Sequence, residues 1–523
     1  MREIKILDCT LRDGGCVNNF EFGNRYMREI LDGIEKSGVE IIELGYIDEK
    51  AGSYKNRTQF INEQVIPDNY MLCKKPEKTY VAMVDYGKYN PDKLSLYTEK
   101  GIDGIRLAFH KKDRKNIIEW GRKILDKGYQ LFIQPMTCLR YSDEEMVDLI
   151  NDVNEKLPDA TAFYIVDSFG EMRLNDLNRI VHIVDHALSS DIAMGLHSHN
   201  NLQLSYSNAV TLLNYPTKRK LIFDASIMGM GKGAGNMNTE LFAEHLKLYE
   251  GKAYEITPLL DVIDKVINQI KENFSWGYSV EYYLSAANRC TPSYASYFYK
   301  KHMLSISQVA ELLDLIAEEK KISFDKNYAE ELYYTYNAKA YNDESDIKKL
   351  AEIVREKRVL LVAPGRSVER HIKEIVKYSE QDDVVSIALN VYPPIDVDFV
   401  FASKETVLDS IENDSQKIIV TSNTKTEKGI KINYATWTKW SGGNSDSALI
   451  VMLNVLKYIG VKNVALAGCD GFEADVDCNY FDEKLKRPVT KEQAERRNAR
   501  AKNFLDDMKK QIEISFITPS KYQ

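Results

Sequence analysis

The sequence predicts an α/β protein made of an N-terminal TIM (β/α)8 barrel, a helical extension and a C-terminal Rossmann-like α/β domain. The chain has 523 residues, which exceeds the roughly 250–300 residues that a single hydrophobic core usually holds. Eight short apolar segments alternate with amphipathic segments over roughly the first 250 residues, the length typical of such a barrel. A second alternation of strands and helices begins after the charged segment around 341–357.

The eight apolar segments are the strands expected in the barrel. Each is a continuous apolar run, and the spacers between them are long enough for a crossover helix, which is typical of a parallel sheet buried on both faces. The predicted strands are Ile4–Asp8, Val39–Leu44, Tyr80–Val84, Gly104–Ala108, Gln130–Gln134, Ala162–Val166, Ala193–His197 and Leu221–Ser226. A doubly wound open sheet is the alternative that the same pattern allows.

The pattern changes after residue 256. PLLDVIDKVINQIKENF and SQVAELLDLIAEEKK carry apolar residues at three- and four-residue spacing, as amphipathic helices do. The stretch between them is rich in tyrosine, which we interpret as packing. We therefore assign 1–256 to the barrel, 257–349 to a helical extension resembling a communication domain, and 350–523 to the α/β domain.

The α/β domain is predicted to begin with the apolar strand of RVLLVAPGRS, which ends in a Pro-Gly turn. A helix over Val368–Tyr378 follows, and a second helix is expected from Asp446 to Ile459. The other predicted strands are Val384–Leu389, Phe399–Ala402, Lys417–Thr421 and Asn463–Ala467.

The composition excludes several classes of protein. Hydrophobic residues make up 44% and charged residues 28%, as in folded globular chains. The net charge of −8 gives no general attraction to nucleic acid. No apolar run reaches the length of about 18 residues that a membrane helix needs, and the N-terminus lacks the apolar core of a signal peptide. We expect a cytoplasmic protein that forms a homo-oligomer.

The cysteines agree with a reducing compartment. There are seven, with no CxxC pair, so neither a disulfide framework nor a zinc ribbon is expected. They are Cys9, Cys16, Cys73, Cys138, Cys290, Cys469 and Cys478.

Polar residues follow strands one, seven and eight, where such a barrel places its chemistry. His197 and His199 are two residues apart on an extended segment, so both imidazoles point to one face. Asp13, after strand one, is the natural carboxylate to complete a facial set of two nitrogens and one oxygen. The alternative for Asp13 is an ordinary Asp-Gly turn. The pattern indicates a metal site.

The segment GMGKGAGN after strand eight is rich in glycine but matches neither a Walker loop nor a dinucleotide fingerprint. Its glycines would let the backbone approach a metal or substrate closely, and Asn236 could supply an amide oxygen to the cation. An ordinary flexible loop is the alternative.

Together these segments resemble the DRE-TIM metallolyase superfamily. The Arg-Asp pair and the Glu that name the superfamily match Arg12, Asp13 and Glu43, and its metal ligands match His197, His199 and Asn236. The stretches HSHNNLQLSYSNAV, DASIMGMGKGAGN and VDSFG look most like the 4-hydroxy-2-oxovalerate aldolases within it. The resemblance covers roughly residues 1–300.

The resemblance implies a metal-dependent carbon–carbon lyase that cleaves or forms a 4-hydroxy-2-oxo acid through a pyruvate-type enolate. A divalent cation, Mn²⁺ or Mg²⁺ before Co²⁺ or Zn²⁺, would act as Lewis acid on the keto oxygen. One alternative is a Claisen-type acyltransferase that condenses an acyl-CoA with a 2-oxo acid on the same scaffold. Another is a non-catalytic scaffold with a nucleotide-binding C-terminal domain.

The resemblance also implies roles for five individual residues. Arg12 would stabilise the enolate, with Glu43 orienting Arg12 or water. Ser168 would contact the substrate carboxylate, although a helix N-cap is an equal alternative. Cys16 stands where the familiar aldolases carry a histidine base, and a neutral thiol is a poor substitute. Tyr278 is a candidate for the proton-transfer role, with packing as its alternative.

A possible ligand site is predicted in the C-terminal domain. Gly365, Arg366 and Ser367 form a strand-to-helix turn that could receive a phosphate, and Asp470 follows a later strand. The domain faintly resembles sialyltransferase-like or pterin-pyrophosphokinase-like domains, which implies a nucleotide. A non-catalytic domain for docking or oligomerisation is the alternative.

Overall fold

A computed structural model of the chain describes residues 2–52, 55–301, 304–338, 341–411, 415–441, 443–475, 479–482, 485–486 and 489–523. It divides into two compact units. The first contains Met1–Ser296 and Ala317–Phe324, and the second contains Tyr297–Ile316 and Asp325–Gln523. The boundaries predicted at 256/257 and 349/350 stay a prediction.

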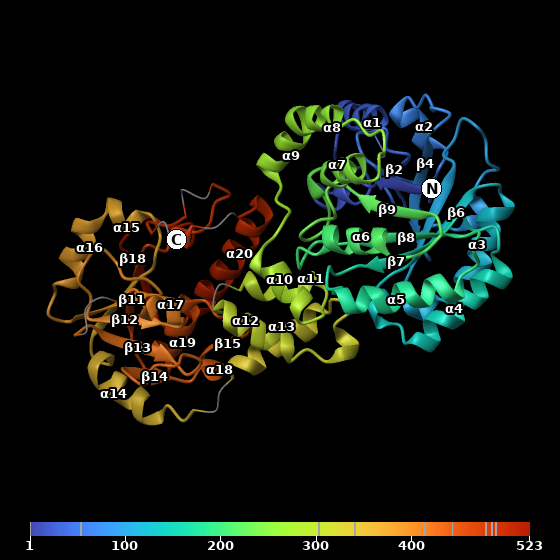
Figure 1. Cartoon of the computed structure of the whole chain (residues 1–523). Helices are drawn as coiled ribbons and strands as arrows, with labels where there is room; N and C mark the ends of the chain where they lie inside the picture. The colour runs from blue at the N-terminus through green and yellow to red at the C-terminus, as the bar shows by residue number, and fades with distance from the viewer. Residues whose placement is uncertain are drawn as a thin grey trace. The chain divides into compact units, whose positions relative to one another are not determined.

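The first unit is the predicted closed barrel of eight parallel strands (Figure 1). The pairing of β1 with β2 closes the sheet and rules out the open alternative. A short additional strand, β3 (Gln59–Phe60), pairs in parallel with the end of β2 and is not one of the eight barrel strands. The barrel strands are β1 (Ile4–Asp8), β2 (Ile41–Ile47), β4 (Thr79–Asp85), β5 (Gly104–Phe109), β6 (Gln130–Pro135), β7 (Ala162–Asp167), β8 (Ala193–Ser198) and β9 (Leu221–Ala225).

Helices surround this barrel, because the strands are apolar on both faces and need an outer cover. They bury their apolar stripes on the sheet to form one continuous core. The helices are α1 (Asn24–Ser37), α2 (Val65–Tyr70), α3 (Ile117–Asp126), α4 (Asp143–Lys156), α5 (Leu174–Ala187), α6 (Ser205–Asn214) and α7 (Thr239–Tyr249).

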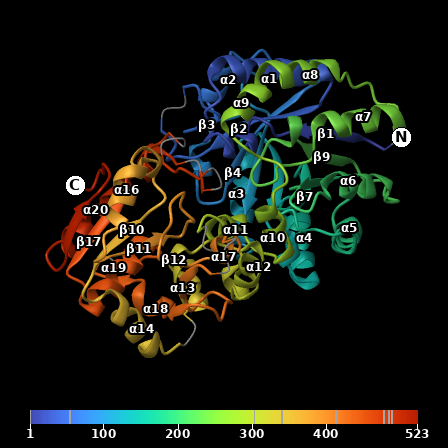
Figure 2. The ribbon, with the colours of Figure 1, turned by 90° about the vertical axis from the view of Figure 1, so that its left-hand side faces the viewer.

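The segment that follows the barrel is helical, as the sequence predicts. α8 (Thr257–Val262) and α9 (Asn268–Asn273) are joined by a π-helical segment, Ile263–Ile267. α8 packs along α1, and both views show the two helices side by side (Figures 1 and 2). The other helices are α10 (Val280–Ala287), α11 (Pro292–Tyr299), α12 (Ile306–Asp314), α13 (Lys326–Asn337) and α14 (Glu344–Val354).

The second unit contains a parallel sheet in the order β14-β13-β12-β11-β10-β17-β18. The chain moves outward from β10 in one direction and then returns to add β17 and β18 on its other side, as in a doubly wound fold. The strands are β10 (Arg358–Val362), β11 (Val384–Leu389), β12 (Phe399–Ala402), β13 (Lys417–Thr421), β14 (Ile430–Ile432), β17 (Asn463–Ala467) and β18 (Glu513–Phe516).

Alternate residues of β10 pack into different cores. Leu361 lies in a core with α14, α19 (Ala448–Ile459) and α20 (Lys491–Met508), whereas Leu360 lies in a core with α16 (Ile372–Ser379). Helices therefore cover both faces, which confirms the Rossmann-like prediction. Short elements complete the unit: α15 (Ser367–Arg370), α17 (Glu405–Leu408), α18 (Tyr434–Trp437), β15 (Lys439–Trp440) and β16 (Gly443–Asn444).

The helix predicted over Val368–Tyr378 is broken into α15 and α16. His371, between them, has φ −121° and ψ 28°, outside the helical range. Six cysteines are free thiols, and Cys478 lies outside the described residues. No helix in the described part of the chain is both long and apolar enough to cross a bilayer.

Candidate metal centre

The loop after β1 forms a tight turn, which places the charged residues Arg12 and Asp13 at the carboxyl end of the barrel. The backbone amides of Arg12 and Asp13 both donate to the carbonyl of Cys9, at 3.1 and 2.8 Å. The hydroxyl of Thr10 accepts a hydrogen bond at 2.8 Å from the backbone of Ile227, in the loop after β9. The loops after β1 and β9 are thereby held together at the carboxyl end of the barrel.

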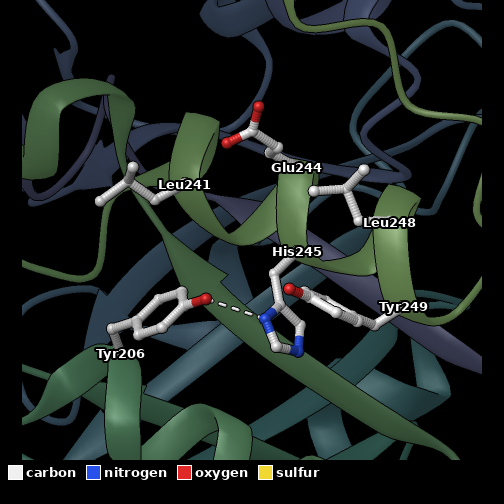
Figure 3. A pocket seen from close by; sticks show the side chains of 6 residues that line it. All are labelled: Tyr206, Leu241, Glu244, His245, Leu248 and Tyr249. Carbon is white, nitrogen blue, oxygen red and sulfur yellow. Dashed lines mark hydrogen bonds between the residues drawn. The ribbon is translucent and has the colours of Figure 1, made fainter.

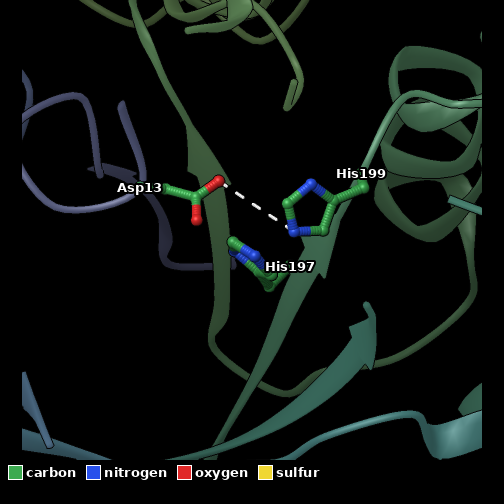
Figure 4. Close-up of side chains that lie close together, drawn as sticks. All are labelled: Asp13, His197 and His199. Carbon is green, nitrogen blue, oxygen red and sulfur yellow. Dashed lines mark ion pairs between the residues drawn. The ribbon is translucent and has the colours of Figure 1, made fainter. Parts of the chain in front are cut away.

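Asp13, His197 and His199 meet at this end (Figure 4). One ligand atom from each lies within 4.8 Å of the others, and the Asp13 Oδ2–His199 Nε2 distance is 3.9 Å. The two imidazole rings are 5.1 Å apart at 86°, and all three residues are buried. Two nitrogens and a carboxylate oxygen around one point could hold a divalent cation.

The protonation of these groups suits cation binding. Burial alone would raise the pKa of the Asp13 carboxyl, but Arg12 and the two imidazoles hold it well below its usual range. Burial lowers the pKa of His199 to about 4, so the imidazole is neutral near pH 7. His197 Nδ1 lies 2.8 Å from Asp224 Oδ2. A proton on this nitrogen leaves His197 Nε2 free to bind a metal.

Asn236 completes the ring of polar groups. Its Nδ2 donates to Asp13 Oδ2, while its buried Oδ1 has no hydrogen-bond partner among the described residues. The prediction placed the amide oxygen toward the cation, whereas here the amide nitrogen faces the Asp13 carboxylate. Turning this amide by 180° would present Oδ1 to the same point, so the residue fits the expected ligand set.

Glu43, on β2, lies behind Arg12 and does not join the ligand group. Its Oε2 accepts a hydrogen bond from Arg12 Nε at 2.8 Å, and Arg12 Nη1 donates to Asp13 Oδ1 at 2.7 Å. The Arg12 guanidinium is therefore fixed by two carboxylates. This geometry is consistent with Glu43 orienting Arg12, as the resemblance implies.

Two residues that sequence reasoning missed lie beneath the site. Arg106, on β5, is fully buried and pairs with Glu43 Oε2 at 2.8 Å while also donating to Asp224 Oδ2. Since Asp224 holds His197, a chain of buried charges connects the Asp13 side of the site to the His197 side. The sequence did carry a signal for these two residues, because Arg106 interrupts the apolar run GIRLAF and Asp224 interrupts the apolar run LIFDA.

The other predicted catalytic residues lie in different surroundings. Ser168 Oγ accepts a hydrogen bond from the Thr137 amide at 3.0 Å. It is not a helix N-cap, because α5 is capped at Arg173. Tyr278 is 59% exposed. The tyrosine that approaches the glycine-rich loop is Tyr282, on α10, beside Gly233.

Cys16 ends the short turn after Asp13, and its side chain is accessible to solvent. Burial of the sulfur by protein atoms and, to a smaller extent, the Asp13 charge nevertheless raise the pKa of the thiol to about 12. A thiol with this pKa stays protonated near neutral pH, so Cys16 does not replace a histidine base.

Three of the four residues predicted in the C-terminal unit contact one another or the adjoining loop, at the carboxyl ends of the neighbouring parallel strands β10 and β17. Asp470 Oδ2 accepts a hydrogen bond from the Ser367 amide at 2.7 Å, and the Ser367 hydroxyl donates to the same carboxylate. Gly365 N donates to the Gly468 carbonyl at 2.9 Å; Arg366 lies between Gly365 and Ser367. Because a carboxylate already occupies this backbone amide, the arrangement disfavours a phosphate at the turn.

A surface pocket of about 330 Å³ lies away from the metal centre, between α6 and α7 (Figure 3). His245 lies between Tyr206 and Tyr249, and its Nδ1 is hydrogen-bonded to the Tyr206 hydroxyl at 2.8 Å. Leu241, Glu244 and Leu248 complete the lining.

Gly231, in the glycine-rich loop, offers a test of the site's geometry. A Cβ at this position would overlap Asn236 Nδ2 and lie 2.6 Å from Asp13 Oδ2. We expect Gly231→Ala to weaken Mn²⁺ binding by about 10- to 100-fold, comparable to losing an outer partner of a metal ligand. Isothermal titration with Mn²⁺ measures this loss. Gly52→Ala is the control, since a Cβ there meets no described atom within 4 Å; equal affinities for both variants would contradict the geometry.

Comparisons with known proteins identify the barrel. The HMGL-like family model matches residues 3–266. The 4-hydroxy-2-oxovalerate aldolase 2 of Comamonas testosteroni is 27% identical over 248 residues, 46% of this chain and 67% of that protein. The 4-hydroxy-2-oxovalerate aldolase of Pseudoalteromonas translucida is 25% identical over 277 residues, 51% of this chain and 76% of that protein.

Among solved structures, the N-terminal domain of a candidate aldolase from Bacteroides vulgatus is similar to this chain. The TM-score is 0.51 at 23% sequence identity, and the match covers 59% of this chain and 99% of that domain. At this identity the likeness concerns the fold alone.

Proposed function

The chain belongs to the HMGL-like family of the DRE-TIM superfamily, and from this membership and the site geometry we propose that it is a divalent-metal-dependent aldolase. Its substrate would be a 4-hydroxy-2-oxo acid, cleaved to an aldehyde and a pyruvate-type 2-oxo acid, or formed from them. Asp13, His197 and His199 would hold the cation, with Asn236 as a further oxygen ligand.

One observation carries the proposal: two residues at the metal centre, Asn236 and Arg12, each hold a buried polar atom without a hydrogen-bond partner among the described residues. Asn236 Oδ1 is an acceptor and Arg12 Nη2 a donor, and neither has a hydrogen-bond partner in the described part of the chain. Unmet buried groups of this kind are costly, by about 1–3 kcal/mol each. Once the Asn236 amide is turned by 180°, its acceptor would face the three ligand groups and suit a cation, and a donor from a permanent cation suits an oxyanion.

A divalent cation bound there would supply Lewis acidity toward the keto oxygen of a 2-oxo acid. Oxygen and imidazole ligands suit Mn²⁺ or Mg²⁺. The remaining work falls to the chain's own residues. Arg12, fixed on one side by Glu43 and on the other by Asp13, presents Nη2 to an oxygen that gains negative charge as the carbon–carbon bond breaks.

The placement of this guanidinium requires little reorganisation during the reaction. Burial would lower the pKa of Arg12, but Glu43 and Asp13 raise it well above its usual value, so its charge is permanent. Asp224 similarly holds the imidazole of His197 in one orientation. Donors and ligands that are fixed before substrate arrives stabilise developing charge more effectively than mobile ones.

Metal removal and restoration test the proposal. Protein stripped with EDTA should not cleave 4-hydroxy-2-oxovalerate, and Mn²⁺ should restore cleavage. Pyruvate is measured through NADH consumption by lactate dehydrogenase, and acetaldehyde is measured separately. A Mg²⁺ series identifies the preferred ion.

Two other outcomes would favour the alternatives. Release of free CoA thiol from an acyl-CoA and pyruvate, without aldol product, would indicate the Claisen-type acyltransferase. Absence of metal binding together with absence of pyruvate C3 proton exchange would indicate a scaffold protein.

A further inference from the structure

Aldol cleavage needs a proton acceptor for the substrate's 4-hydroxyl group, and three groups at the metal centre, those of Cys16, His197 and Arg12, do not suit that role. The Cys16 thiol stays protonated near neutral pH for the reasons given above. His197 has one ring nitrogen bound to Asp224 and the other in the ligand group. Arg12 is permanently charged. An acceptor should therefore be sought on the rest of the barrel's inner wall.

The strand register identifies which side chains line that wall. Arg106 points into the barrel, because its partners Glu43 and Asp224 belong to β2 and β9, which do not neighbour β5. Met83, on β4, is paired with Arg106 and shares its face. Since side chains alternate along a strand, Asp85 at the carboxyl end of β4 also points inward. It is half-buried, at the end of the barrel where the metal centre lies.

Tyr46, on β2, is the partner of Asp85. It is paired with Met83 across the neighbouring strand, so it faces the same interior. Its phenol lies near enough to the Asp85 carboxylate to lower the pKa of that carboxyl, and its ring stacks on Phe20 with centroids 6.1 Å apart. Tyr46 and Asp85 are therefore neighbours on the inner wall of the barrel.

Asp85 also lies close enough to the proposed site for its charge to interact with it. Arg12 is the foremost charged group that acts on Asp85, and Asp85 in turn acts on Cys16. Burial raises the pKa of the Asp85 carboxyl while the Tyr46 phenol and Arg12 oppose the rise. A carboxylate with a raised pKa is a better proton acceptor than an ordinary aspartate.

A separate observation supports a polar ligand at the inner wall of the barrel. Asp85 is paired with Ala108, and Ala108 with Gln134, so all three lie at one level of the barrel and face inward. Gln134 is 2% exposed, and its Nε2 has no hydrogen-bond partner among the residues that the structure describes. Ala108, between the two polar residues, has only a methyl group. An oxygen of a bound molecule near Gln134 would satisfy its amide.

We propose that Asp85, beside Tyr46 on the inner wall, is the proton acceptor of the aldol cleavage, an inference that rests on the proposed function. The proton of the 4-hydroxyl passes to the Asp85 carboxylate as the carbon–oxygen double bond of the aldehyde forms. The C3–C4 bond breaks, and its electron pair enters the enolate over C3, C2 and the keto oxygen. The aldehyde leaves, and the proton returns from Asp85 to C3, which gives the 2-oxo acid and restores the carboxylate.

The test compares three variants of the full chain, loaded with Mn²⁺, in cleavage of 4-hydroxy-2-oxovalerate. We expect Asp85→Asn to lower kcat by at least about 100-fold, the usual contribution of a general base, with Mn²⁺ affinity close to that of the wild type. Formate added to Asp85→Ala should restore part of the rate. Tyr46→Phe should lower kcat by about 10-fold, because the carboxylate loses the hydroxyl group beside it.

Tyr86→Phe is the matched control. Tyr86 follows Asp85 but faces outward, where its ring packs on Trp120 at 4.6 Å, and this variant should keep the wild-type kcat. Wild-type kcat in Asp85→Asn, or no rescue of Asp85→Ala by formate, would overturn the inference while leaving the proposed function intact. Absence of cleavage by the wild type with any divalent metal would overturn both.

Discussion

Asp13→Asn is expected to abolish Mn²⁺-dependent cleavage, with a loss of at least about 1000-fold. The change keeps the shape of the side chain but removes the only negative charge among the three grouped ligands. The Arg12 guanidinium, 2.7 Å from Asp13 Oδ1, would then repel a divalent cation with only Glu43 to offset its charge. A Lewis acid contributes several kcal/mol to such a reaction, and each 1.4 kcal/mol corresponds to about tenfold in rate.

Direct metal titration separates this effect from unfolding. Asp13→Asn should show no saturable Mn²⁺ binding at the concentrations that saturate the wild type, with an unchanged circular dichroism spectrum. Asp159→Asn is the control, since Asp159 is exposed in the turn before β7. Retention of wild-type Mn²⁺ affinity in Asp13→Asn would contradict the assignment of Asp13 as a ligand.

The barrel strands could be predicted because their physical signal is local. A parallel strand covered on both faces must be apolar throughout, and each such run in the first 226 residues became a strand, within a few residues at its ends. The missed strands lack that signal. β14 has three residues, and β18, at the edge of its sheet, alternates between exposed and half-buried positions.

Residues of the candidate site were predicted unequally for a related reason. Asp13, His197 and His199 stand in loops and strand ends, where polar residues draw attention. Arg106 and Asp224 stand inside strands, and their meaning depends on pairing across the barrel, which a single sequence does not show. Tyr278 and Tyr282 are four residues apart in a tyrosine-rich stretch, and only the position of α10 distinguishes the exposed one from the one beside the glycine-rich loop.

The second large expected effect is a loss of stability when the buried charge of Arg106, beneath the metal centre, is removed. Arg106→Met should lower the melting temperature of the protein by roughly 10 °C. Burial would lower the pKa of Arg106, but Asp224 and Glu43 raise it well above its ordinary value, so the side chain carries its charge at all relevant pH values. Removing it leaves two buried carboxylates undercompensated, at a cost of about 3–5 kcal/mol. In a domain of roughly 250 residues, such as the barrel, each kcal/mol lowers the melting temperature by about 2–4 °C.

Differential scanning calorimetry with and without Mn²⁺ measures both the stability and the metal response. The surface pair Arg25–Glu29 provides the control, because the Arg25 side chain is 82% exposed. Arg25→Met should change the melting temperature by less than about 2 °C, since exposed ion pairs contribute roughly 0–1 kcal/mol. Equal shifts in both variants would show that Arg106 contributes no more than a surface charge.

A double variant distinguishes lost charge compensation from lost packing of Arg106 against Tyr164, whose ring lies 4.9 Å from the guanidinium. If undercompensated charge dominates, Asp224→Asn should destabilise the Arg106→Met protein much less than it destabilises the wild type. Mn²⁺ affinity should be lower in the double variant than in the wild type, because a neutral amide holds the His197 imidazole less firmly than the carboxylate does. Additive effects on stability would instead attribute the loss to the cavity left by Arg106. Wild-type Mn²⁺ affinity in the double variant would show that His197 needs neither charge beneath it.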